Sequence, residues 1–584
     1  MPTKSDSPFT AQAINALGER YLWTHHGTTE SPPQMFERVA THVAAVEKET
    51  SLWSKRYFEL MNGFLFLPNS PTLMNAGRKG GQLSACYVLP IEDSISSIFS
   101  TLKLAALIQQ SGGGTGFNFS KLRPADSVVS AGLGKATGPV GFIELYNAAT
   151  ESVKQAGKRR GANMGILNVN HPDITSFVSA KRSETALHNF NLSVGISDAF
   201  MEAVKENKVW TLSHDSGVKT TIRARRLWDL IINHAWQSGD PGIVFLDQME
   251  KCNPTPSLGL LHTTNPCGEV PLLPYESCNL GSINLSIMVL DIGSRCTIDW
   301  EKLKTTVQFA TRFLDNVIDS NHYVDDNMRK MAVGNRKIGL GVMGWADLLI
   351  RLEIPYESKE AVFLAERVMR FINFWSFRES QILASEKGNF PNWKKSVYYK
   401  QHPIRNATRT AIAPTGSISM IANASSSIEP LFALIYTREN ERGERTQTNI
   451  NRWFVRHLNK VGLLTQPLMD DVMATGHLPE SPAIPRSVRN LFKTSLEISY
   501  THHLLHQVAF QRHTDNAVSK TINMPEQTLP EEVGQAMWMA WQRGLKGVTV
   551  YRNGAKKSQV LNAGADAEYL RHLHDVNPCR VCLE

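Results

Sequence analysis

The sequence has no long hydrophobic run. No stretch of about 18 consecutive apolar residues occurs among its 584 residues, so no transmembrane helix is expected. Its first residues, MPTKSDSPFTAQAINAL, also lack the apolar core of a secretory signal peptide. These two absences predict a cytoplasmic protein with no membrane partner.

Cysteine is scarce. There are 7 cysteines, so a disulfide framework of the kind found in small secreted domains is not expected. The cysteines are Cys86, Cys252, Cys267, Cys278, Cys296, Cys579 and Cys582. We expect reduced thiols, a few of which carry chemistry; for Cys252 and Cys296 the sequence suggests no role. The sequence also has no HExxH motif and no cluster of histidines, so no metal site is expected.

A strong charge of one sign is also missing. The formal net charge is +8, from 62 basic and 54 acidic residues. The densest basic cluster, Lys158-Arg159-Arg160, is short and is followed by Gly161. A small positive excess favours phosphate-bearing ligands. Because no basic arm is present, we predict nucleotides as ligands and not a nucleic acid polymer.

The hydrophobic pattern divides the chain into three parts. Residues 1–62 are predicted to be a helical segment, because apolar residues recur at helical spacing in MFERVATHVAAVEKE. In residues 63–552, strand-like runs such as GIVFLD (242–247) alternate with helical runs such as TTVQFATRFLDNVID (305–319). This alternation is typical of α/β proteins with largely parallel strands. Residues 553–584 are small and polar and are predicted to form a flexible tail.

The segment Asn265-Pro266-Cys267-Gly268-Glu269 is the first candidate for chemistry. Proline fixes one backbone angle and glycine frees another, so the loop is tight. In a locally extended loop, the amide, the thiol and the carboxylate at alternate positions would project to one side. A thiol between a hydrogen-bonding amide and a general base suits chemistry on a polyol. The alternative is an inert buried cysteine in a turn.

Two other cysteines lie in strand-like segments. Cys86 is within SACYV, and Cys278 is within SCNLGSINLS. If these segments were neighbours, the two thiols could form a reversible disulfide, which depends on their proximity.

The chain also has a C-terminal C-x-x-C pair, Cys579 and Cys582. Such pairs exchange readily with disulfides, which favours a mobile dithiol. The alternative is a zinc site that His572 and His574 complete.

Two glycine-containing segments are candidates for ligand contact. Pro414-Thr415-Gly416-Ser417-Ile418 follows a β-like run and opens a predicted helix, where backbone amides bind phosphate well. The segment 111–116, SGGGTG, is not a dinucleotide fingerprint, because the preceding LKLAALIQQ is helical and Phe117 occupies the last glycine position. Its glycines are expected to allow close approach of a ligand or of another backbone.

Seven segments, in this order, resemble the ribonucleotide reductase catalytic subunit, and more closely its adenosylcobalamin-dependent class II. They are NSPTLMNAG, SACYV, GGGTGFNFSKLRP, KQAGKRRGANMGILNVNHPDI, NPCGE, SCNLGSINLS and APTGSIS. The resemblance implies a ten-stranded α/β barrel with the NPCGE loop inserted through its centre. It also implies reduction of ribonucleotides, with diphosphates favoured, to 2′-deoxyribonucleotides for DNA synthesis.

The resemblance implies roles for the reacting residues. Cys267 would carry a thiyl radical that takes the 3′-hydrogen of the ribose. Glu269 would act as base on the 3′-hydroxyl, and Asn265 would bind the ribose hydroxyls. Cys86 and Cys278 would supply two electrons and become a disulfide, with Cys86 beside the leaving 2′-hydroxyl.

The resemblance further implies binding residues and partners. Cys579 and Cys582 would reduce the active-site disulfide, and thioredoxin or a glutaredoxin-like protein would restore them. Asp93 and Arg123 resemble a dNTP effector site where two subunits meet, so a homodimer is expected. The remaining expected substrate contacts are Ser70, Ala85, Gly114, Pro266, Gly268, Pro414, Thr415, Gly416, Ser417 and Ile418.

The expected radical source is adenosylcobalamin. Oxygen-dependent class I subunits carry two adjacent tyrosines near the end of the barrel, and here Val550 precedes the single Tyr551. The terminal motif of the glycyl-radical class is replaced by Cys-Leu-Glu. Three alternatives remain: a class I large subunit that needs a radical-generating partner, a catalytically inactive nucleotide-binding regulator, and a plain thiol–disulfide oxidoreductase.

Overall fold

A computed structural model describes residues 9–25, 27–129, 134–155, 159–181, 186–293, 295–439, 445–556 and 561–564. The predicted redox pair Cys579 and Cys582 lies outside the described residues. The chain begins with three helices, α1 (Ala11–Arg20), α2 (Pro32–Ala44) and α3 (Thr50–Asn62). Pro32 and Pro33 begin α2, where Ser31 and Gln34 form a capping box. A short hairpin of β1 (Thr24–His25) and β2 (Thr28–Thr29) separates α1 from α2.

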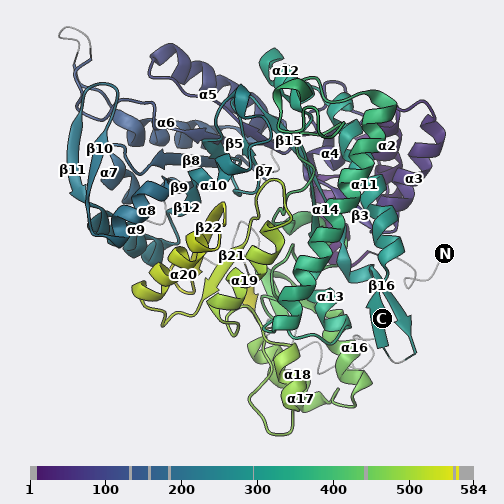
Figure 1. Ribbon diagram of the computed structural model, residues 1–584. Coiled ribbons are helices and arrows are strands. Elements are labelled where there is room, and N and C mark those ends of the chain that lie inside the picture. The colour runs from purple at the N-terminus through teal and green to yellow at the C-terminus, as the bar shows by residue number, and fades with distance from the viewer. Residues whose placement is uncertain are drawn as a thin grey trace.

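A ten-stranded sheet forms the centre of the molecule (Figure 1). Its strands are β3 (Phe66–Pro68), β4 (Cys86–Val88), β5 (Gly114–Asn118), β8 (Asn163–Asn168), β9 (Phe190–Ile196), β12 (Gly242–Phe245), β15 (Ser277–Asn284), β18 (Ile338–Met343), β21 (Thr521–Met524) and β22 (Gly547–Arg552). Most of these strands are buried on both faces, which explains why they are apolar runs without polar alternation.

The strands form two parallel runs. The first is β4-β5-β8-β9-β12, and β15-β18 and β21-β22 are the parallel pairs of the second. The runs meet in antiparallel pairs, β15 with β4 and β12 with β22. Parallel bridges from Leu340 to Thr410 and from Ile412 to Val518 insert the chain at 408–412 between β18 and β21. The ring is thereby closed, and the predicted α/β barrel is confirmed.

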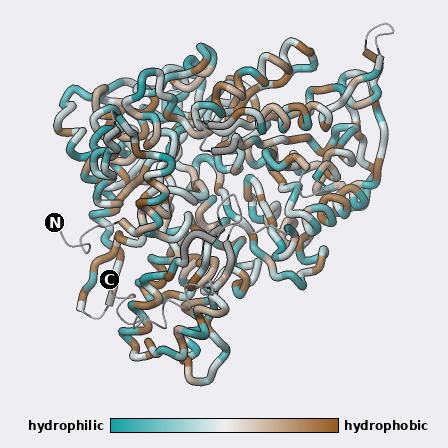
Figure 2. Tube along the Cα trace, turned by 180° about the vertical axis from the view of Figure 1, so that it is seen from behind, coloured by the Kyte–Doolittle hydropathy of each residue, from teal (hydrophilic) through white to brown (hydrophobic). Residues whose placement is uncertain are grey.

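Helices cover the barrel on its outside. One hydrophobic core joins α2 and α3 to α11 (Trp300–Ser320), α13 (Trp345–Arg351) and α14 (Lys359–Lys387). A second core joins the other side of the barrel to α5 (Ile95–Gln110), α6 (Gly138–Ser152), α9 (Ala224–Ser238) and α20 (Pro530–Gln542). Hydrophobic and hydrophilic residues are interspersed along the trace, as expected where elements bury one face and expose the other (Figure 2).

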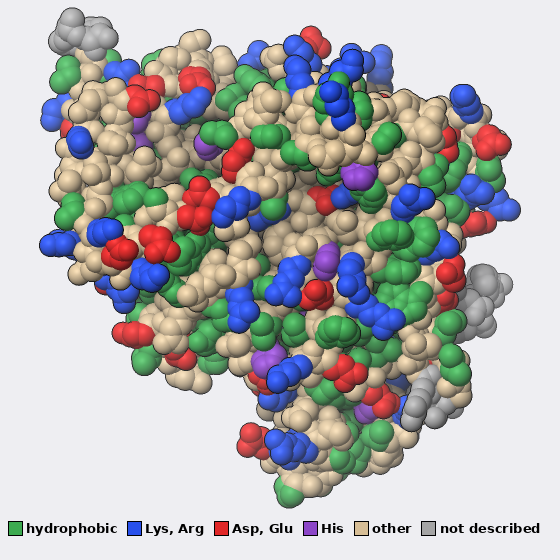
Figure 3. Space-filling view, viewed as in Figure 1, with side chains coloured by type: hydrophobic (Ala, Val, Ile, Leu, Met, Phe, Trp, Pro, Cys, Tyr) green, Lys and Arg blue, Asp and Glu red, His purple; other side chains and the backbone are tan. Residues whose placement is uncertain are grey.

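A small lobe extends from the barrel at the bottom of Figure 1. It contains α16 (Arg452–Lys460), α17 (Gln466–Thr475) and α18 (Arg486–Leu491), which share a separate hydrophobic core. Basic and acidic side chains are interspersed over the face drawn in Figure 3, in agreement with the small net charge. Among the described helices, none combines the length and the hydropathy needed to cross a bilayer.

Candidate active site

The segment 265–269 forms the tip of a short hairpin inside the barrel. Its strands, β13 (Thr263–Thr264) and β14 (Pro271–Leu272), pair antiparallel. The amide of Gly268 donates to the carbonyl of Asn265 at 3.1 Å, and Gly268 has a φ of +82°. The loop is therefore a β-turn, and the predicted tight loop is confirmed. Pro266 and Gly268 account for the turn, because one fixes φ and the other allows a positive φ. The extended conformation that would project alternate side chains to one side is not found.

Glycines on β5 make room for this hairpin. A Cβ on Gly116 would overlap the carbonyl oxygen of Thr264, and a Cβ on Gly114 would lie 2.7 Å from Pro266 Cγ. The predicted close approach of another backbone to the 111–116 segment is therefore confirmed. The carbonyl of Pro266 also accepts a hydrogen bond from Asn191 Nδ2 at 2.8 Å, which holds the tip to β9.

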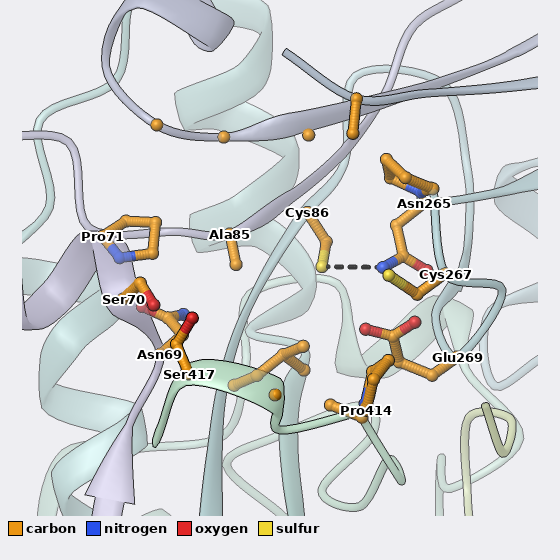
Figure 4. Close-up of a pocket in the computed structure, with 18 of the residues that line it drawn as sticks. Asn69, Ser70, Pro71, Ala85, Cys86, Asn265, Cys267, Glu269, Pro414 and Ser417 are labelled. Atoms are coloured by element: carbon orange, nitrogen blue, oxygen red, sulfur yellow. Dashed lines mark hydrogen bonds between the residues drawn. The ribbon is translucent and has the colours of Figure 1, made fainter. Parts of the chain in front are cut away.

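A cavity of about 340 Å³ lies beside the hairpin tip (Figure 4). The predicted residues that line it are Ser70, Ala85, Cys86, Gly114, Asn265, Pro266, Cys267, Glu269, Pro414, Thr415, Gly416, Ser417 and Ile418. Gly268 and Cys278 are not among its lining residues. The sequence analysis missed Asn69, Gln109, Gly161 and the backbone of 280–282, which also line the cavity. Asn69, Gly161 and 280–282 lie in segments that carry the family resemblance, whereas Gln109 lies in the preceding helical run and was given no role.

Asn265 connects the reacting groups. Its Nδ2 donates to Cys86 Sγ at 3.0 Å, and its Oδ1 accepts from the Val270 amide at 3.1 Å. Glu269 is buried, and its Oε2 has no hydrogen-bond partner among the described residues. Burial raises the pKa of Glu269 from 4.5 to about 7. A carboxyl with a pKa near neutrality can accept and return a proton at physiological pH.

Cys86 and Cys278 lie directly opposite each other on β4 and β15. Directly opposite residues of an antiparallel pair have Cα atoms about 4.5–5.5 Å apart, within the range that a disulfide spans. Both cysteines are present as thiols, and burial raises the pKa of each. The proximity on which a reversible disulfide depended is therefore met.

A second cavity, of about 450 Å³, lies on the other side of the hairpin tip. Cys267 is exposed and borders both cavities, and Gly268 lines only this one. Its walls come from β9, β12, β21 and β22 and include Gln507, whose buried Oε1 has no hydrogen-bond partner among the described residues. The cysteine at the turn can therefore be reached by two different ligands.

Asp93 and Arg123, the predicted effector residues, lie outside both cavities. The Arg123 side chain forms an ion pair with Asp93 at 2.7 Å, and its backbone amide donates to the same carboxylate. Asp93 precedes α5, whose surface carries the exposed apolar side chains Ile95, Phe99 and Leu107.

Comparisons with known proteins agree with this geometry. The family described as "Ribonucleotide reductase, barrel domain" matches residues 84–402 and 399–551, and "Ribonucleotide reductase, all-alpha domain" matches residues 7–81. Vitamin B12-dependent ribonucleoside-diphosphate reductases of Thermoplasma acidophilum and Mycobacterium tuberculosis are each 45% identical to the chain. These alignments cover 97% and 95% of the chain and 81% and 80% of the two relatives.

A solved structure also shares the fold. The class Id ribonucleotide reductase alpha subunit of Actinobacillus ureae superposes with a TM-score of 0.78 at 22% identity, covering 95% of this chain and 99% of that one. The resemblance noted in the sequence is confirmed, and the chain belongs to the ribonucleotide reductase large-subunit family.

Proposed function

We propose that this chain reduces ribonucleoside diphosphates to 2′-deoxyribonucleotides by radical chemistry at Cys267. The observation that carries the proposal is the convergence of Cys267, Asn265, Glu269 and Cys86 on one cavity, with Cys278 directly opposite Cys86. This set contains a hydrogen acceptor, a base, a hydrogen-bonding amide and a dithiol. The reduction of a ribose hydroxyl requires all four.

The ribose reacts at its 3′ and 2′ positions. The Cys267 thiyl radical takes the 3′-hydrogen, and the Glu269 carboxylate takes the proton of the 3′-hydroxyl. The Cys86 thiol protonates the 2′-hydroxyl as it leaves as water. Asn265, which already bonds to Cys86, orients the ribose hydroxyls and the thiol together. General acid and base groups of this kind contribute about 10²–10⁴-fold each to a rate.

Two electrons must then reach the substrate. Cys86 and Cys278 supply them and become a disulfide, for which their opposed positions are suitable. The Cys267 thiyl radical is regenerated when the 3′-hydrogen returns to the product. The dithiol is therefore consumed in each turnover, whereas the radical cysteine is not.

The remaining cavity residues bind the rest of the nucleotide. The loop 414–418, with Ser417 facing the cavity, is suited to the phosphates, because its amides and hydroxyls donate hydrogen bonds to anions (Figure 4). The backbones of Ala85 and Gly114 and the side chain of Ser70 border the space for the ribose.

The second cavity fits the adenosyl part of adenosylcobalamin. Its volume of about 450 Å³, its contact with Cys267 and the unpartnered Gln507 Oε1 suit a group with hydrogen-bond donors. Ser193, Thr549 and Gln507 would hold such a group, and Gly242 and Gly547 leave room for it. When bound, adenosylcobalamin supplies an organic radical that can oxidise a thiol. Cys267 borders both cavities, so it would lie between the bound cofactor and the substrate.

Partners follow from the proposed cycle. The tail cysteines Cys579 and Cys582 would reduce the barrel disulfide, and thioredoxin or a glutaredoxin-like dithiol protein would reduce the tail. A dNTP effector would bind near Asp93 and Arg123. Two subunits would meet through α5, because a row of exposed apolar side chains on one helix is typical of an interface.

The decisive experiment is an assay of the purified chain with CDP, adenosylcobalamin and a dithiol. We expect dCDP to form without any second protein, and Cys267→Ser to abolish its formation while nucleotide binding remains. Activity only after addition of a radical-generating subunit would favour the class I alternative. Binding of CDP without turnover would favour the inactive regulator, and thiol–disulfide exchange that survives Cys267→Ser as the sole activity would favour a plain oxidoreductase.

A further inference from the structure

Cys278 has a cysteine on one neighbouring strand and a lysine on the other. Cys86 lies directly opposite it on β4. On the other side, Asn279 is in register with Ile338 of β18, so Lys337, one residue earlier, is in line with Cys278. Side chains in register on neighbouring strands project from the same face of a sheet. The Cys278 thiol therefore lies in a row between the Cys86 thiol and the Lys337 side chain.

Lys337 forms an unusually well enclosed ion pair. Its Nζ lies 2.6 Å from Glu276 Oε2, and each side chain is only 1% exposed. The carboxylate of Glu276 is completed by hydrogen bonds from Asn335 Nδ2 and from the Leu273 amide. A buried ion pair is seldom more stabilising than an apolar pair of similar volume. The proposed chemistry of Cys267, Glu269 and Asn265 does not use this pair.

The two thiols of the expected disulfide are in different surroundings. Both belong to one small apolar cluster with Leu280 and Ala411, but Cys86 also lines the substrate cavity and Cys278 does not. An incoming thiolate can therefore reach Cys86 from the cavity, whereas it cannot reach Cys278 from there. Thiol–disulfide exchange proceeds through such an attack, and it is faster when the leaving sulfur is stabilised as a thiolate.

The charges nearby also distinguish the two sulfurs. Burial raises the pKa of Cys278, and Lys337 is the strongest charge that opposes this rise, while Glu269 and Glu276 add to it. Burial also raises the pKa of Cys86, and Glu269 raises it further. For Cys86 the opposing contribution is a neutral hydrogen bond from Asn265. A thiolate at Cys278 therefore has a compensating cation, and a thiolate at Cys86 does not.

We propose that Lys337 is a positioning residue for re-reduction: the Cys86–Cys278 disulfide opens by attack on Cys86 from the cavity, and Lys337 stabilises the departing Cys278 thiolate. This inference rests on the proposed function, which supplies the disulfide. It concerns only the reductive half of the cycle, in which no radical takes part.

The atoms and electrons of this step balance. A dithiol, in the cycle that of the tail, supplies the attacking thiolate. Its sulfur bonds to Cys86 Sγ, the Cys86–Cys278 bond breaks, and the electron pair stays on Cys278 Sγ, which then takes up a proton. The second sulfur of the dithiol attacks the mixed disulfide and releases Cys86. Two electrons and two protons have then passed from the dithiol, which becomes a disulfide, to Cys86 and Cys278.

The direction of opening is tested in the full-length chain with Cys579→Ser and Cys582→Ser, which removes the tail thiols. The enzyme is oxidised by one turnover, mixed with excess 2-mercaptoethanol and quenched with acid at short times. Free thiols are then blocked with N-ethylmaleimide, and the cysteines are identified by mass spectrometry. We expect the mercaptoethanol adduct on Cys86 and the maleimide on Cys278. An adduct on Cys278 with a blocked Cys86 would overturn the proposal.

The role of the lysine is tested by the rate of opening. The double variant Lys337→Met with Glu276→Gln removes the ion pair without leaving one buried charge alone, and we expect opening about tenfold slower. Lys337→Arg keeps a cation beside Cys278 and should retain most of the rate, which loss of packing alone does not predict. Lys302→Met, which removes a lysine whose Nζ donates to the Ile287 carbonyl, is the matched control and should leave the rate unchanged.

The outcomes distinguish failure of the Lys337 inference from failure of the proposed function. Equal opening rates in the chain with Lys337 and in the double variant would overturn the inference, and the adduct mapping decides even if the double variant does not fold. If turnover with CDP never produces a Cys86–Cys278 disulfide, the proposed function itself fails. If the disulfide forms but opens at Cys278, only the present inference fails.

Discussion

Glu269 is a carboxyl group in a wall of sulfur, amide and apolar atoms. It is 2% exposed, and burial raises its pKa to about 7. Its Oε2 faces no donor among the described residues, so the carboxylate is available to a substrate hydroxyl. Asn265 and Cys86 are held in contrast by direct hydrogen bonds. At the scale of single residues, the site therefore combines a carboxylate oxygen that has no partner among the described residues with an amide and a thiol that hydrogen bonds hold in place.

Glu269→Gln tests the base. We expect turnover to fall by about 10²–10⁴-fold, because an amide cannot take the proton of the 3′-hydroxyl. In the unsubstituted chain, turnover should rise with pH through about 7, as the carboxyl deprotonates. Initial rates of dCDP formation between pH 5.5 and 8.5 measure both effects. A flat pH profile together with an unaffected variant would exclude Glu269 as the base.

Glu269→Gln, which should lower turnover, should raise the stability of the folded chain at high pH. A carboxyl whose pKa is raised on folding binds a proton more tightly in the folded chain, so stability falls as pH rises from 4.5 to about 7. Glutamine carries no charge and avoids this cost, which amounts to about 3 kcal/mol at most above pH 7. Thermal unfolding should show the variant more stable than the parent at pH 8, with little difference at pH 5. A difference that is independent of pH would contradict this account.

The hairpin of β13 and β14 is the element that carries Cys267 into the barrel. It can enter because β5 has glycine at 114 and 116, where side chains would collide with Pro266 and Thr264. The turn at its tip depends on Gly268 with its positive φ. The position of Cys267 therefore depends on two elements that pack against each other. The β13–β14 hairpin reaches the centre of the barrel, and β5 has no side chains at 114 and 116 that would block it.

Gly116→Ala should disable the site without touching a reacting group. The new methyl group would collide with the Thr264 carbonyl, displace the hairpin and reduce turnover by at least about 10²-fold, as small misplacements of reacting groups do. Gly18→Ala is the matched control, because a Cβ there meets nothing within 4 Å and alanine favours helix α1. Turnover assays and thermal unfolding of both variants provide the comparison. Full activity of the Gly116 variant would mean that the hairpin can shift at no cost.

Across the whole molecule, buried charges connect the N-terminal helices to the barrel. Arg312 of α11 contacts Glu47, in the turn between α2 and α3, at 3.6 Å and Glu379 of α14 at 3.1 Å. Lys387 also contacts Glu47, at 2.8 Å. Arg312, Glu47 and Glu379 are each less than 10% exposed. The helical segment is therefore attached to the barrel by a network that tolerates little change.

Arg312→Met should destabilise the chain by about 3–5 kcal/mol, because it leaves Glu379 buried without its cation and leaves Glu47 with Lys387 alone. Arg225→Met, which breaks an exposed pair with Asp229, is the control and should cost less than about 1 kcal/mol. Thermal and urea unfolding of the two variants measure the difference. Equal effects would indicate that the buried network contributes no more than a surface ion pair.

At the largest scale, the exposed apolar side chains of α5 are predicted to form the interface of the proposed homodimer. Phe99 is 50% exposed on α5, between Ile95 and Leu107. Phe99→Asp should convert a dimer into monomers and abolish the response to dNTP effectors, because it places a charge in an apolar interface. Phe363→Asp alters a phenylalanine on α14 that is 70% exposed, and it should leave the proposed dimer intact. Sedimentation analysis of both variants decides whether α5 is the interface.

The identities of the reacting groups could be read from local sequence. Cys267, Glu269 and Asn265 lie within five residues, and the alternation of strands and helices is a local pattern of hydrophobicity. Side-chain chemistry and short-range spacing are properties of neighbouring residues, which explains why the α/β class and the candidate cysteine could be predicted. The ten-stranded barrel and the radical role of Cys267 were implied only by the family resemblance. The tight loop could also be predicted, from Pro266 and Gly268, but the directions of its side chains could not, because they depend on the β-turn that is found.

Only the tertiary structure decided which distant residues meet. The register that sets Cys86 opposite Cys278, and Lys337 beside it, is fixed by strands far apart in the chain. The second cavity beside Cys267 arises where β9, β12, β21 and β22 come together, and Gln109 reaches the first cavity through the packing of α5. Such contacts depend on how buried faces of many elements fit at once. The sequence by itself therefore determined which reactive side chains the chain carries. Packing determined which of them lie together, because Cys86, Cys278 and Lys337 are brought into one row only by the strand register.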